Sequence, residues 1–292
     1  MPSIQAKVIA DSMSPGGVRL TTLQLVYPRF VHAEFMTHRV FSRNASSSRA
    51  IPVSKMIEQV RSNPAMPVHW GKNQPGMQAR SSLQGFKLAV ARALWRAAGK
   101  VACLFAWGMI KIGLHKQVAN RLLEPWQIIH VVVTATEWEN FFELRAHPDA
   151  QPEIHELALR MQEAMAASTP VSKKAGEWHL PYVMPGELLP GGGIYEHLRA
   201  TKETVSKEDL LEVACACSTA RSARVSFLRH DGTPSEVVED LALYAKLVGS
   251  RPIHASPSEH QAMAADDASV WSGNLRGWVQ HRKLIEARHA CV

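Results

Sequence analysis

Apolar residues recur at helical spacing in the middle of the chain. Ile154, Leu157, Ala158, Met161 and Met165 follow the pattern of one helix face. This spacing predicts an amphipathic helix whose apolar side packs against a core.

Other segments favour helices by composition. Residues 84–114 are rich in Ala, Leu, Lys and Arg, which predicts a predominantly helical stretch with Gly99 as a position at which it could be interrupted. Residues 30–40 predict a shorter helix, and Pro52 is expected to open another that runs through residues 52–60. The chain is therefore expected to be rich in helix.

Strand-like patterns are fewer. Residues 18–27 alternate in part between apolar and polar positions and stop at Pro28, while residues 128–133 form a short β-branched run. Because helices outnumber strands, we predict an α+β fold. It is a helix-rich single domain over residues 1–292 with a small mixed or antiparallel sheet.

The carboxyl half of the chain contains two signals for helix starts and one long segment without a helix or strand pattern. Residues 206–209 and residues 233–236 each have the spacing of a capping box, and the second helix is expected to end at Gly249. Residues 168–194 are rich in proline and glycine, which predicts a long loop.

Length and composition indicate a globular protein. The chain has 292 residues, of which 46% are apolar, enough to bury a sizeable core. The longest apolar run, residues 101–110, is far shorter than the ~20 residues that a membrane-spanning helix needs. The first residues show no cleavable signal, so the expected location is the cytoplasm.

The net charge indicates what kind of partner the protein binds, and the cysteines indicate its redox compartment. The formal net charge of +7 indicates a negatively charged partner, such as nucleic acid, a mononucleotide, a dinucleotide cofactor or a polyglutamylated folate. Cys103, Cys215, Cys217 and Cys291 have no zinc-site spacing, so we predict buried free thiols in a reducing compartment. The 14 histidines form no metal-binding motif, and no metal is expected.

The first candidate for chemistry is the stretch 37–49, where arginines and hydroxyl-bearing residues are concentrated. Guanidinium groups match phosphate oxygens in pairs, and serine hydroxyls and backbone N–H groups complete a phosphate cradle. The alternative interpretation is a solvated loop of serines and arginines.

The second candidate is Arg145. Trp138, Phe141 and Phe142 recur with it at helical spacing, which places a guanidinium beside an aromatic stripe where it could be held for a planar ligand. Taken alone, the pattern favours an arginine that snorkels from a core helix.

Residues 37–49 also resemble the signature R-H-R-x-x-S-x-N-E-x-S-x-R of the flavin-dependent thymidylate synthases, the ThyX family. The positions in register are His38, Arg39, Ser42, Asn44, Ser47 and Arg49. Thr37 and Ala45 depart from the signature, because the family has Arg and Glu there.

Three later segments resemble further motifs of the same family. Residues 134–145 and 149–154 resemble N-x-R-S-x-x-N-F-x-x-L-R followed by H-A-Q-x-E-I. Thr134 and Thr136 replace the asparagine and the arginine of the first of these. Residues 120–125 resemble A-R-x-x-L-P, whose arginine binds nucleotide phosphate in the family.

The order of the motifs is unusual. Residues 222–227 and 254–260 resemble A-A-R-V-S-[FY] and H-x-S-P-F-E-H, which come first in ordinary members and last here. The chain is therefore interpreted as a circularly permuted, phage-like member of the family. Residues 1–165 would carry the signature and ligand motifs, 166–200 a joining loop, and 201–292 the usual amino-terminal part.

The permuted order makes one spatial prediction. His260 should lie near His38 and Arg39, in the same or a neighbouring subunit, although they are far apart in the sequence.

The resemblance implies methylation of dUMP to dTMP with FAD, NADPH and 5,10-methylenetetrahydrofolate, in the host cytoplasm if a phage encodes the protein. It also implies a homotetramer with shared active sites. Arg145 is the implied catalytic residue, whose fixed charge polarises the pyrimidine base. The implied nucleotide-binding residues are Glu34, Thr37, Ser47, Ser48, Arg49, Arg121 and Arg145. The implied FAD-binding residues are Thr37, His38, Arg39, Asn44, Ala45, Thr134, Thr136, Asn140, Ser256 and His260.

Two alternatives stay open. Glu34, Thr37 and Ala45 replace family residues that line nucleotide and flavin, which leaves room for a flavin-dependent hydroxymethylase of dUMP or dCMP. In that reaction water replaces hydride at the final step. The basic stretch 80–116 also fits a non-catalytic protein that binds nucleic acid.

Overall fold

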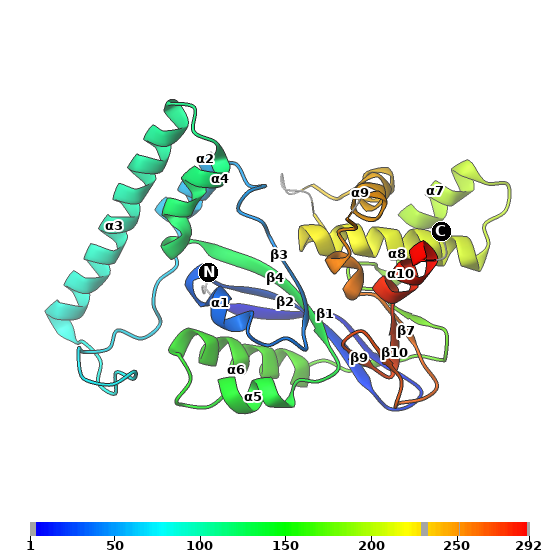
Figure 1. Ribbon diagram of the computed structural model, residues 1–292, viewed down its shortest axis with the longest axis horizontal. Coiled ribbons are helices and arrows are strands. Elements are labelled where there is room, and N and C mark those ends of the chain that lie inside the picture. The colour runs from blue at the N-terminus through cyan, green and yellow to red at the C-terminus, as the bar shows by residue number, and fades with distance from the viewer. Residues whose placement is uncertain (1–3, 229–232, 251, 291–292) are drawn as a thin grey trace.

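A five-stranded sheet lies at the centre of the protein, in a computed structural model that describes residues 4–228, 233–250 and 252–290. Helices cover one face of the sheet, flank one end of it and gather beyond the other end (Figure 1). The strand order is β3-β4-β2-β1-β5. These strands are β1 (Gln5–Met13), β2 (Arg19–Pro28), β3 (Ser42–Ala45), β4 (Ile128–Ala135) and β5 (Val171–Ser172).

The helices account for most of the remaining chain. The α-helices are α1 (His32–Phe35), α2 (Val53–Ser62), α3 (Gly85–Lys111), α4 (Lys116–Ala119), α5 (Glu139–Arg145), α6 (Pro152–Ala166), α7 (Gly193–Thr201), α8 (Lys207–Arg224), α9 (Val237–Gly249) and α10 (His281–Ala290). The short 3₁₀ helices are η1 (Arg29–Val31), η2 (Asn120–Trp126), η3 (Pro185–Leu188) and η4 (Ser256–Glu259). The mixed, helix-rich fold confirms the predicted class.

β2 is the central strand, and it confirms the strand predicted from the alternating pattern. It pairs antiparallel with β1 on one side and with β4 on the other, so that Leu23 faces Val8 and Val133. β4 likewise confirms the predicted β-branched strand. β5 adds a short parallel edge to β1.

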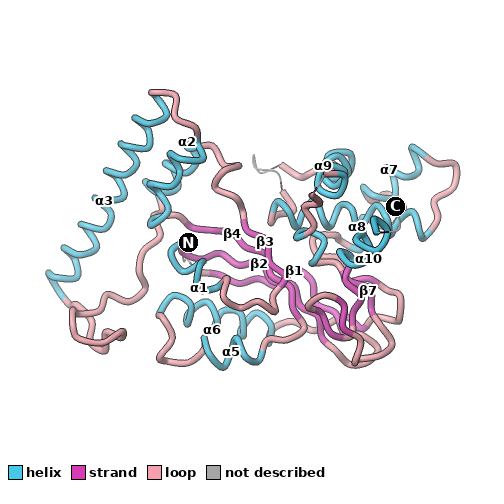
Figure 2. The backbone as a smooth tube through the Cα atoms, viewed as in Figure 1, coloured by secondary structure: helices cyan, strands magenta, loops and turns pink. Residues whose placement is uncertain are grey.

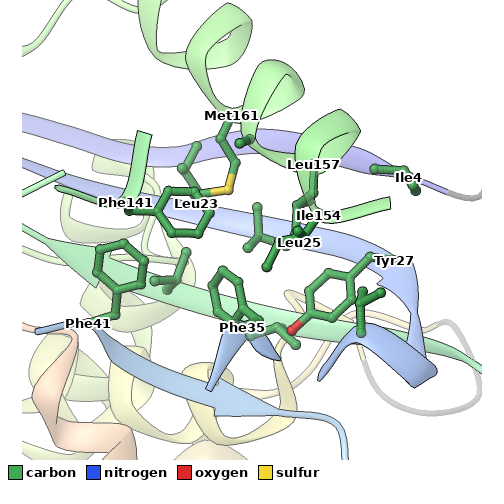
Figure 3. Close-up of a cluster of buried hydrophobic side chains, with 14 of the residues drawn as sticks. Ile4, Leu23, Leu25, Tyr27, Phe35, Phe41, Phe141, Ile154, Leu157 and Met161 are labelled. Carbon is green, nitrogen blue, oxygen red and sulfur yellow. The ribbon is translucent and has the colours of Figure 1, made fainter. Parts of the chain in front are cut away.

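The main core lies between this sheet and the helices α5 and α6. Ile154, Leu157 and Met161 on α6 are fully buried and face Leu23 and Leu25 of β2 (Figure 3). Burying one such side chain contributes about 1.5–3 kcal/mol, so this row anchors the helix. The amphipathic helix predicted from residues 154–165 is confirmed.

Aromatic rings connect the segment after α1 to α5. The ring of Phe41 lies 4.7 Å from Trp138 and 5.2 Å from Phe141, and Phe35 lies 5.9 Å from Phe141, measured between ring centroids. Aromatic pairs at such distances attract one another beyond the area they bury. The packing therefore holds the signature segment against the helix that ends at Arg145.

α2, α3 and η2 form a separate layer at one end of the sheet (Figure 2). α3 runs without a break from Gly85 to Lys111, which confirms the long helix predicted over residues 84–114 and shows no interruption at Gly99. Gly99 instead allows a close approach to η2, because a Cβ there would lie 3.1 Å from the indole of Trp126.

The carboxyl segment docks against the other end of the sheet. Its strands β7 and β10 form a three-stranded sheet with β6 of the preceding segment, in the order β10-β7-β6, and its strands β8 and β9 form a two-stranded hairpin. Trp278 is fully buried, packs in one cluster with Leu20, and donates its indole N–H to the Val18 carbonyl oxygen over 3.1 Å. These strands are β6 (Trp178–His179), β7 (Ala262–Ala264), β8 (Trp271–Ser272), β9 (Leu275–Arg276) and β10 (Trp278–Gln280).

Several predicted boundaries are corrected. The helix expected over residues 30–40 ends at Phe35, because the chain then turns and its carbonyl groups bond to the Arg43 side chain. The loop expected over residues 166–200 contains β5, β6 and η3, and α7 begins within it at Gly193. β1, the strands β7 to β10 and α10 were not predicted, because their apolar patterns are too short or too irregular.

The two predicted capping boxes have different outcomes. Ser206 accepts the backbone N–H of Asp209 over 3.1 Å and caps α8 as predicted. The second helix, α9, begins after Glu236 instead of after Thr233, so that capping box is wrong, whereas its end at Gly249 is confirmed.

Three of the predicted free thiols are confirmed. Cys103, Cys215 and Cys217 are buried and unpaired, while Cys291 lies outside the described residues. Within the described ranges, no helix combines the length and the apolar character needed to cross a membrane. The same ranges contain no group of three or more His, Cys, Asp or Glu side chains placed to hold a metal ion.

Candidate functional site

The signature segment and α5 meet at Arg145. The Arg145 guanidinium donates through Nε to His38 Nε2 over 2.9 Å and through Nη1 to the carboxylate of Glu34. Thr37 closes the turn by donating its hydroxyl to the Glu34 carbonyl oxygen over 2.7 Å. We call Glu34, Thr37, His38 and Arg145 the arginine cluster. It joins two motifs that are more than a hundred residues apart in the sequence.

Arg43 shapes the turn that presents His38. Its Nη1 donates to the carbonyl oxygens of His38 over 2.6 Å and Phe41 over 3.1 Å, and its Nη2 donates to that of Met36 over 3.1 Å. The edge of the His38 ring packs on Phe141, with centroids 4.8 Å apart. Arg43 was not among the predicted site residues, because its position carries no letter in the family signature.

His38 is neutral in this setting. Burial lowers the pKa of the His38 imidazole, and the positive charges of Arg145 and Arg43 lower it further. Because Nε2 accepts the Arg145 N–H, the single ring proton of neutral His38 sits on Nδ1.

Glu34 and Arg145 place opposite charges side by side at a partly exposed position. Their side chains are 29% and 21% exposed, so a ligand can reach both. The pair offers a fork of N–H donors next to a carboxylate acceptor. A planar base with acceptors and a donor along one edge is complementary to this arrangement.

A second group of predicted residues lies in the loop after β3. Ser47 accepts the Arg49 backbone N–H over 3.3 Å, and the Ser48 carbonyl oxygen accepts Asn120 Nδ2 over 2.7 Å. Arg49 is exposed, and it makes no ion pair among the described residues. Arg121 is also exposed, but Glu124 holds it over 3.1 Å. The loop therefore keeps one uncompensated guanidinium beside several hydroxyl groups.

A third group is a continuous chain of buried hydrogen bonds. Ser12 Oγ lies 2.9 Å from His179 Nδ1, and His179 Nε2 lies 2.8 Å from Thr22 Oγ1. Thr22 Oγ1 lies 2.7 Å from Thr134 Oγ1, which lies 2.8 Å from His260 Nδ1. We call these five residues the buried relay. None is more than 3% exposed, and His260 Nε2 has no partner among the described residues.

The backbone explains why these groups meet. Thr22 and Thr134 are directly opposite one another on β2 and β4, so their hydroxyls share a face of the sheet. His179 is opposite Ala262 in the smaller sheet, which brings His260 to the same place. Ser12, Thr22 and His179 were not predicted as site residues, because isolated Ser, Thr and His residues in strands are common.

The other predicted residues are arranged less tightly. Thr136 accepts the backbone N–H of Arg276 over 3.2 Å and so holds the carboxyl-terminal hairpin. The remaining ones are exposed or lie along β3: Arg39, Asn44, Ala45, Asn140 and Ser256.

A buried ion network stabilises the region of the predicted motif 222–227. Arg221 donates to Asp240 over 2.7 Å, to Glu187 over 2.8 and 2.9 Å, and to the Tyr182 carbonyl oxygen over 2.8 Å. Arg224 also bonds to Asp240. Burial acts to lower the pKa of Arg221, but the two carboxylates outweigh it and raise that pKa. The two arginines therefore stabilise the packing of α8 against α9 and η3.

A recess of about 650 Å³ opens between α2 and α3, lined by Ile57, Arg61, Lys100, Cys103, Leu104 and Trp107. None of the predicted site residues lines it.

Comparisons with known proteins give one family. The family model described as "Thy1: Thymidylate synthase complementing protein" matches residues 13–171, more than half of the chain. No curated protein matches.

Solved structures show weak likenesses. The UMP/dUMP methylase PolB from Streptomyces cacaoi bound with 5-Br UMP is 19% identical with a TM-score of 0.48, covering 57% of this chain and 90% of that one. The same enzyme bound with 5-Br dUMP is also 19% identical with a TM-score of 0.48, and the match covers 57% of this chain and 91% of that one. Thymidylate Synthase X (ThyX) from Helicobacter pylori with FAD and dUMP is 16% identical with a TM-score of 0.34, covering 50% and 67%.

Proposed function

The chain belongs to the thymidylate synthase complementing protein (Thy1) family, and we propose that it methylates dUMP to dTMP in a flavin-dependent reaction. Methylenetetrahydrofolate would supply the carbon and NADPH would reduce the flavin. The observation that carries this proposal is the arginine cluster, where Arg145 from α5 meets His38 from the signature segment and Glu34 from α1. Two family motifs thereby converge on one partly exposed guanidinium.

Arg145 acts on the pyrimidine base in this proposal. Its fixed positive charge favours the form of the base that is ionised at N3, which makes C5 more nucleophilic toward the one-carbon donor, and its planar fork fits the edge of the ring. Neutral His38 accepts the Arg145 Nε–H and so fixes the plane of the guanidinium. The nucleotide phosphate would be held by residues in and beside the loop after β3, which supply hydroxyl groups and positive charge: Ser47, Ser48, Arg49 and Arg121.

The donor set also suits a flavin. FAD carries carbonyl oxygens, ring nitrogens and a pyrophosphate, and His260 Nε2 is a buried polar atom without a partner among the described residues. We propose that His38, Arg39, Asn140 and His260 contact the flavin, together with Thr37, Asn44, Ala45, Thr136 and Ser256, and that Thr134 acts through His260. When bound, FAD supplies the hydride, while the protein binds, orients and excludes water.

The permuted interpretation has support from tertiary contacts. η4 and α8, which belong to the carboxyl-terminal motifs, pack against β3 of the signature region. His260 bonds to Thr134, whose partner on β3 is Ser42, three positions beyond Arg39. The nearness of His260 to His38 and Arg39 themselves stays a prediction.

Ending the chain at Gly249 tests the permutation. The truncated protein should lose flavin, because η4, His260 and the buried Trp278 are removed. Since this variant is expected to fold poorly, His260→Gln in the full chain provides the second test. A truncated protein that stays yellow and active would contradict the permuted interpretation.

A homotetramer with shared sites is the proposed assembly. Support comes from α3, whose outward face carries Phe86, Leu94, Val101, Leu104 and Phe105, each at least 52% exposed. An exposed apolar row of this length is typical of a face that another copy covers. Light scattering after gel filtration should show smaller particles for Leu94→Glu/Leu104→Glu. Val171→Glu, at another exposed apolar residue, should leave the mass unchanged.

Product analysis tests the reaction. The purified protein should be yellow and, with dUMP, methylenetetrahydrofolate and NADPH, should yield a nucleotide that is heavier by CH2 in mass spectrometry, because a methyl group replaces a hydrogen. A colourless protein that retains nucleic acid would instead support the nucleic-acid-binding alternative.

The Glu34–Arg145 pair favours a second candidate, a hydroxymethylase that acts on dCMP. The amino group of cytosine can donate to the Glu34 carboxylate while N3 and O2 accept from Arg145, whereas uracil would set its O4 against the carboxylate. Calorimetry should then show tighter binding of dCMP than of dUMP, and Glu34→Gln should reverse the order. Glu143→Gln, at an exposed residue of the same helix as Arg145, is the control. A hydroxymethylated product would decide for this candidate.

A further inference from the structure

The buried relay is a chain of five polar side chains in which every link can run in either of two directions. Each link contains one proton, because hydroxyl groups and neutral imidazoles have one proton each. The direction of the links decides whether the free end, His260 Nε2, is a donor or an acceptor.

In the first arrangement, His260 carries its proton on Nε2. Ser12 then donates to His179 Nδ1, and His179 Nε2 donates to Thr22. Thr22 donates to Thr134, and Thr134 donates to His260 Nδ1. Each of the four links then has its proton, and within the relay only the N–H at His260 Nε2 has no partner among the described residues.

In the second arrangement, His260 carries its proton on Nδ1 and every link is reversed. His179 Nδ1 then donates to Ser12, whose own proton has no further acceptor among the described residues. His260 Nε2 is left as an unpartnered acceptor as well. This arrangement leaves two buried groups unsatisfied instead of one, so the first is favoured.

We propose that the buried relay fixes neutral His260 with its proton on Nε2 and thereby offers a hydrogen-bond donor to an acceptor atom of the bound ligand. Thr134 is fully buried and its hydroxyl is engaged by Thr22 and His260, so in this proposal it is a positioning residue that acts through His260 and does not touch the flavin itself. The identity of the ligand as a flavin rests on the proposed function, whereas the proton positions do not. Because Nε2 is covered as well as unpartnered, the proposal requires that the groups covering it move aside when the acceptor binds.

Burial keeps both imidazoles neutral, as the relay requires. It lowers the pKa of His260 to about 3 and, as the largest of several causes, lowers the pKa of His179 to about 3. A charged imidazole would have protons on both nitrogens and would break one link of the chain. The relay therefore works unchanged at neutral pH.

Nitrogen NMR of the full chain labelled with ¹⁵N-histidine tests the proton positions. His260 and His179 should both show a protonated Nε2 and an unprotonated Nδ1. Thr134→Val removes the hydroxyl but keeps the shape, and it should shift His260 toward the Nδ1-protonated form. Thr134→Ser keeps the hydroxyl and should restore the original signals. Thr21→Val is the control, since Thr21 is equally buried on β2 but bonds to Asp11, outside the relay.

Titration with FAD tests the ligand end. Binding should move the His260 Nε2–H signal, and Thr134→Val should weaken FAD about five- to tenfold, the effect of one hydrogen bond. Nδ1-protonated histidines in the unmodified chain, or a His260 signal unmoved by Thr134→Val, would overturn the relay. If FAD binds without moving the signal, the donor role is refuted. If FAD does not bind at all, the flavin proposal fails, while the proton positions still decide the relay.

Discussion

Replacing Arg145 by lysine separates charge from geometry at the candidate site. Arg145 makes two contacts that differ in kind: an ion pair with Glu34 and a hydrogen bond of 2.9 Å to His38. Lysine keeps a positive charge that can satisfy Glu34, but it has no second N–H in a fixed plane to reach His38. The substitution therefore removes one hydrogen bond and the planar fork.

The magnitude follows from that loss. A hydrogen bond to a charged group contributes about 1.5–3 kcal/mol, which corresponds to about a 10- to 100-fold fall in kcat/KM if it is made in the transition state. Stability should change little, because the Arg145 side chain is 21% exposed and Glu34 keeps a cationic partner.

The assay is product formation at several nucleotide concentrations, with thermal unfolding in parallel. Arg160→Lys on α6 is the matched control, because Arg160 also bonds to two side chains, Glu156 and Glu163, but lies on the surface. Activity within twofold of the unmodified protein would refute the catalytic role of Arg145. A large fall in unfolding temperature would show that the residue is structural instead.

Three further predictions concern stability. Arg221→Met should cost about 3–5 kcal/mol in urea unfolding, because it leaves buried carboxylates without their main partner, whereas Arg199→Met at an exposed site should change it by less than about 0.5 kcal/mol. Leu157→Ala should cost about 2–5 kcal/mol by opening a cavity under α6. The unfolded chain binds protons on His179 and His260 near pH 6.5, while the folded chain binds them only near pH 3. Their contribution to the free energy of unfolding should therefore be fully present above pH 6.5 and should be lost as the pH falls from 6.5 to 3. The double variant His179→Gln/His260→Gln should show a smaller loss of stability over this pH range.

The sequence by itself determined the elements with long, regular patterns. The helix from 152 to 166 and the strand β2 were predicted because their apolar residues repeat with the period of one face over several turns or pleats. The resemblance also pointed to Glu34, His38 and Arg145 as one site, and the structure brings their side chains into contact. Local periodicity and motif spacing carry this information within the chain.

Tertiary structure decided whatever depends on partners distant in the sequence. Arg43 could not be chosen among the arginines of its segment, because its task is set by carbonyl groups that turn toward it only after folding. The need for a glycine at position 99 likewise depends on Trp126, a ring from another element that leaves little room for a Cβ there.

The buried relay shows the same limit most clearly. Ser12, Thr22, Thr134, His179 and His260 come from strands β1, β2, β4 and β6 and the segment after η4, and nothing in their local sequence links them. Hydrogen bonds between buried side chains depend on distances of about 3 Å, which are fixed only when two sheets have packed. The sequence supplies the polar groups, and the packing of the sheets decides which of them share a proton.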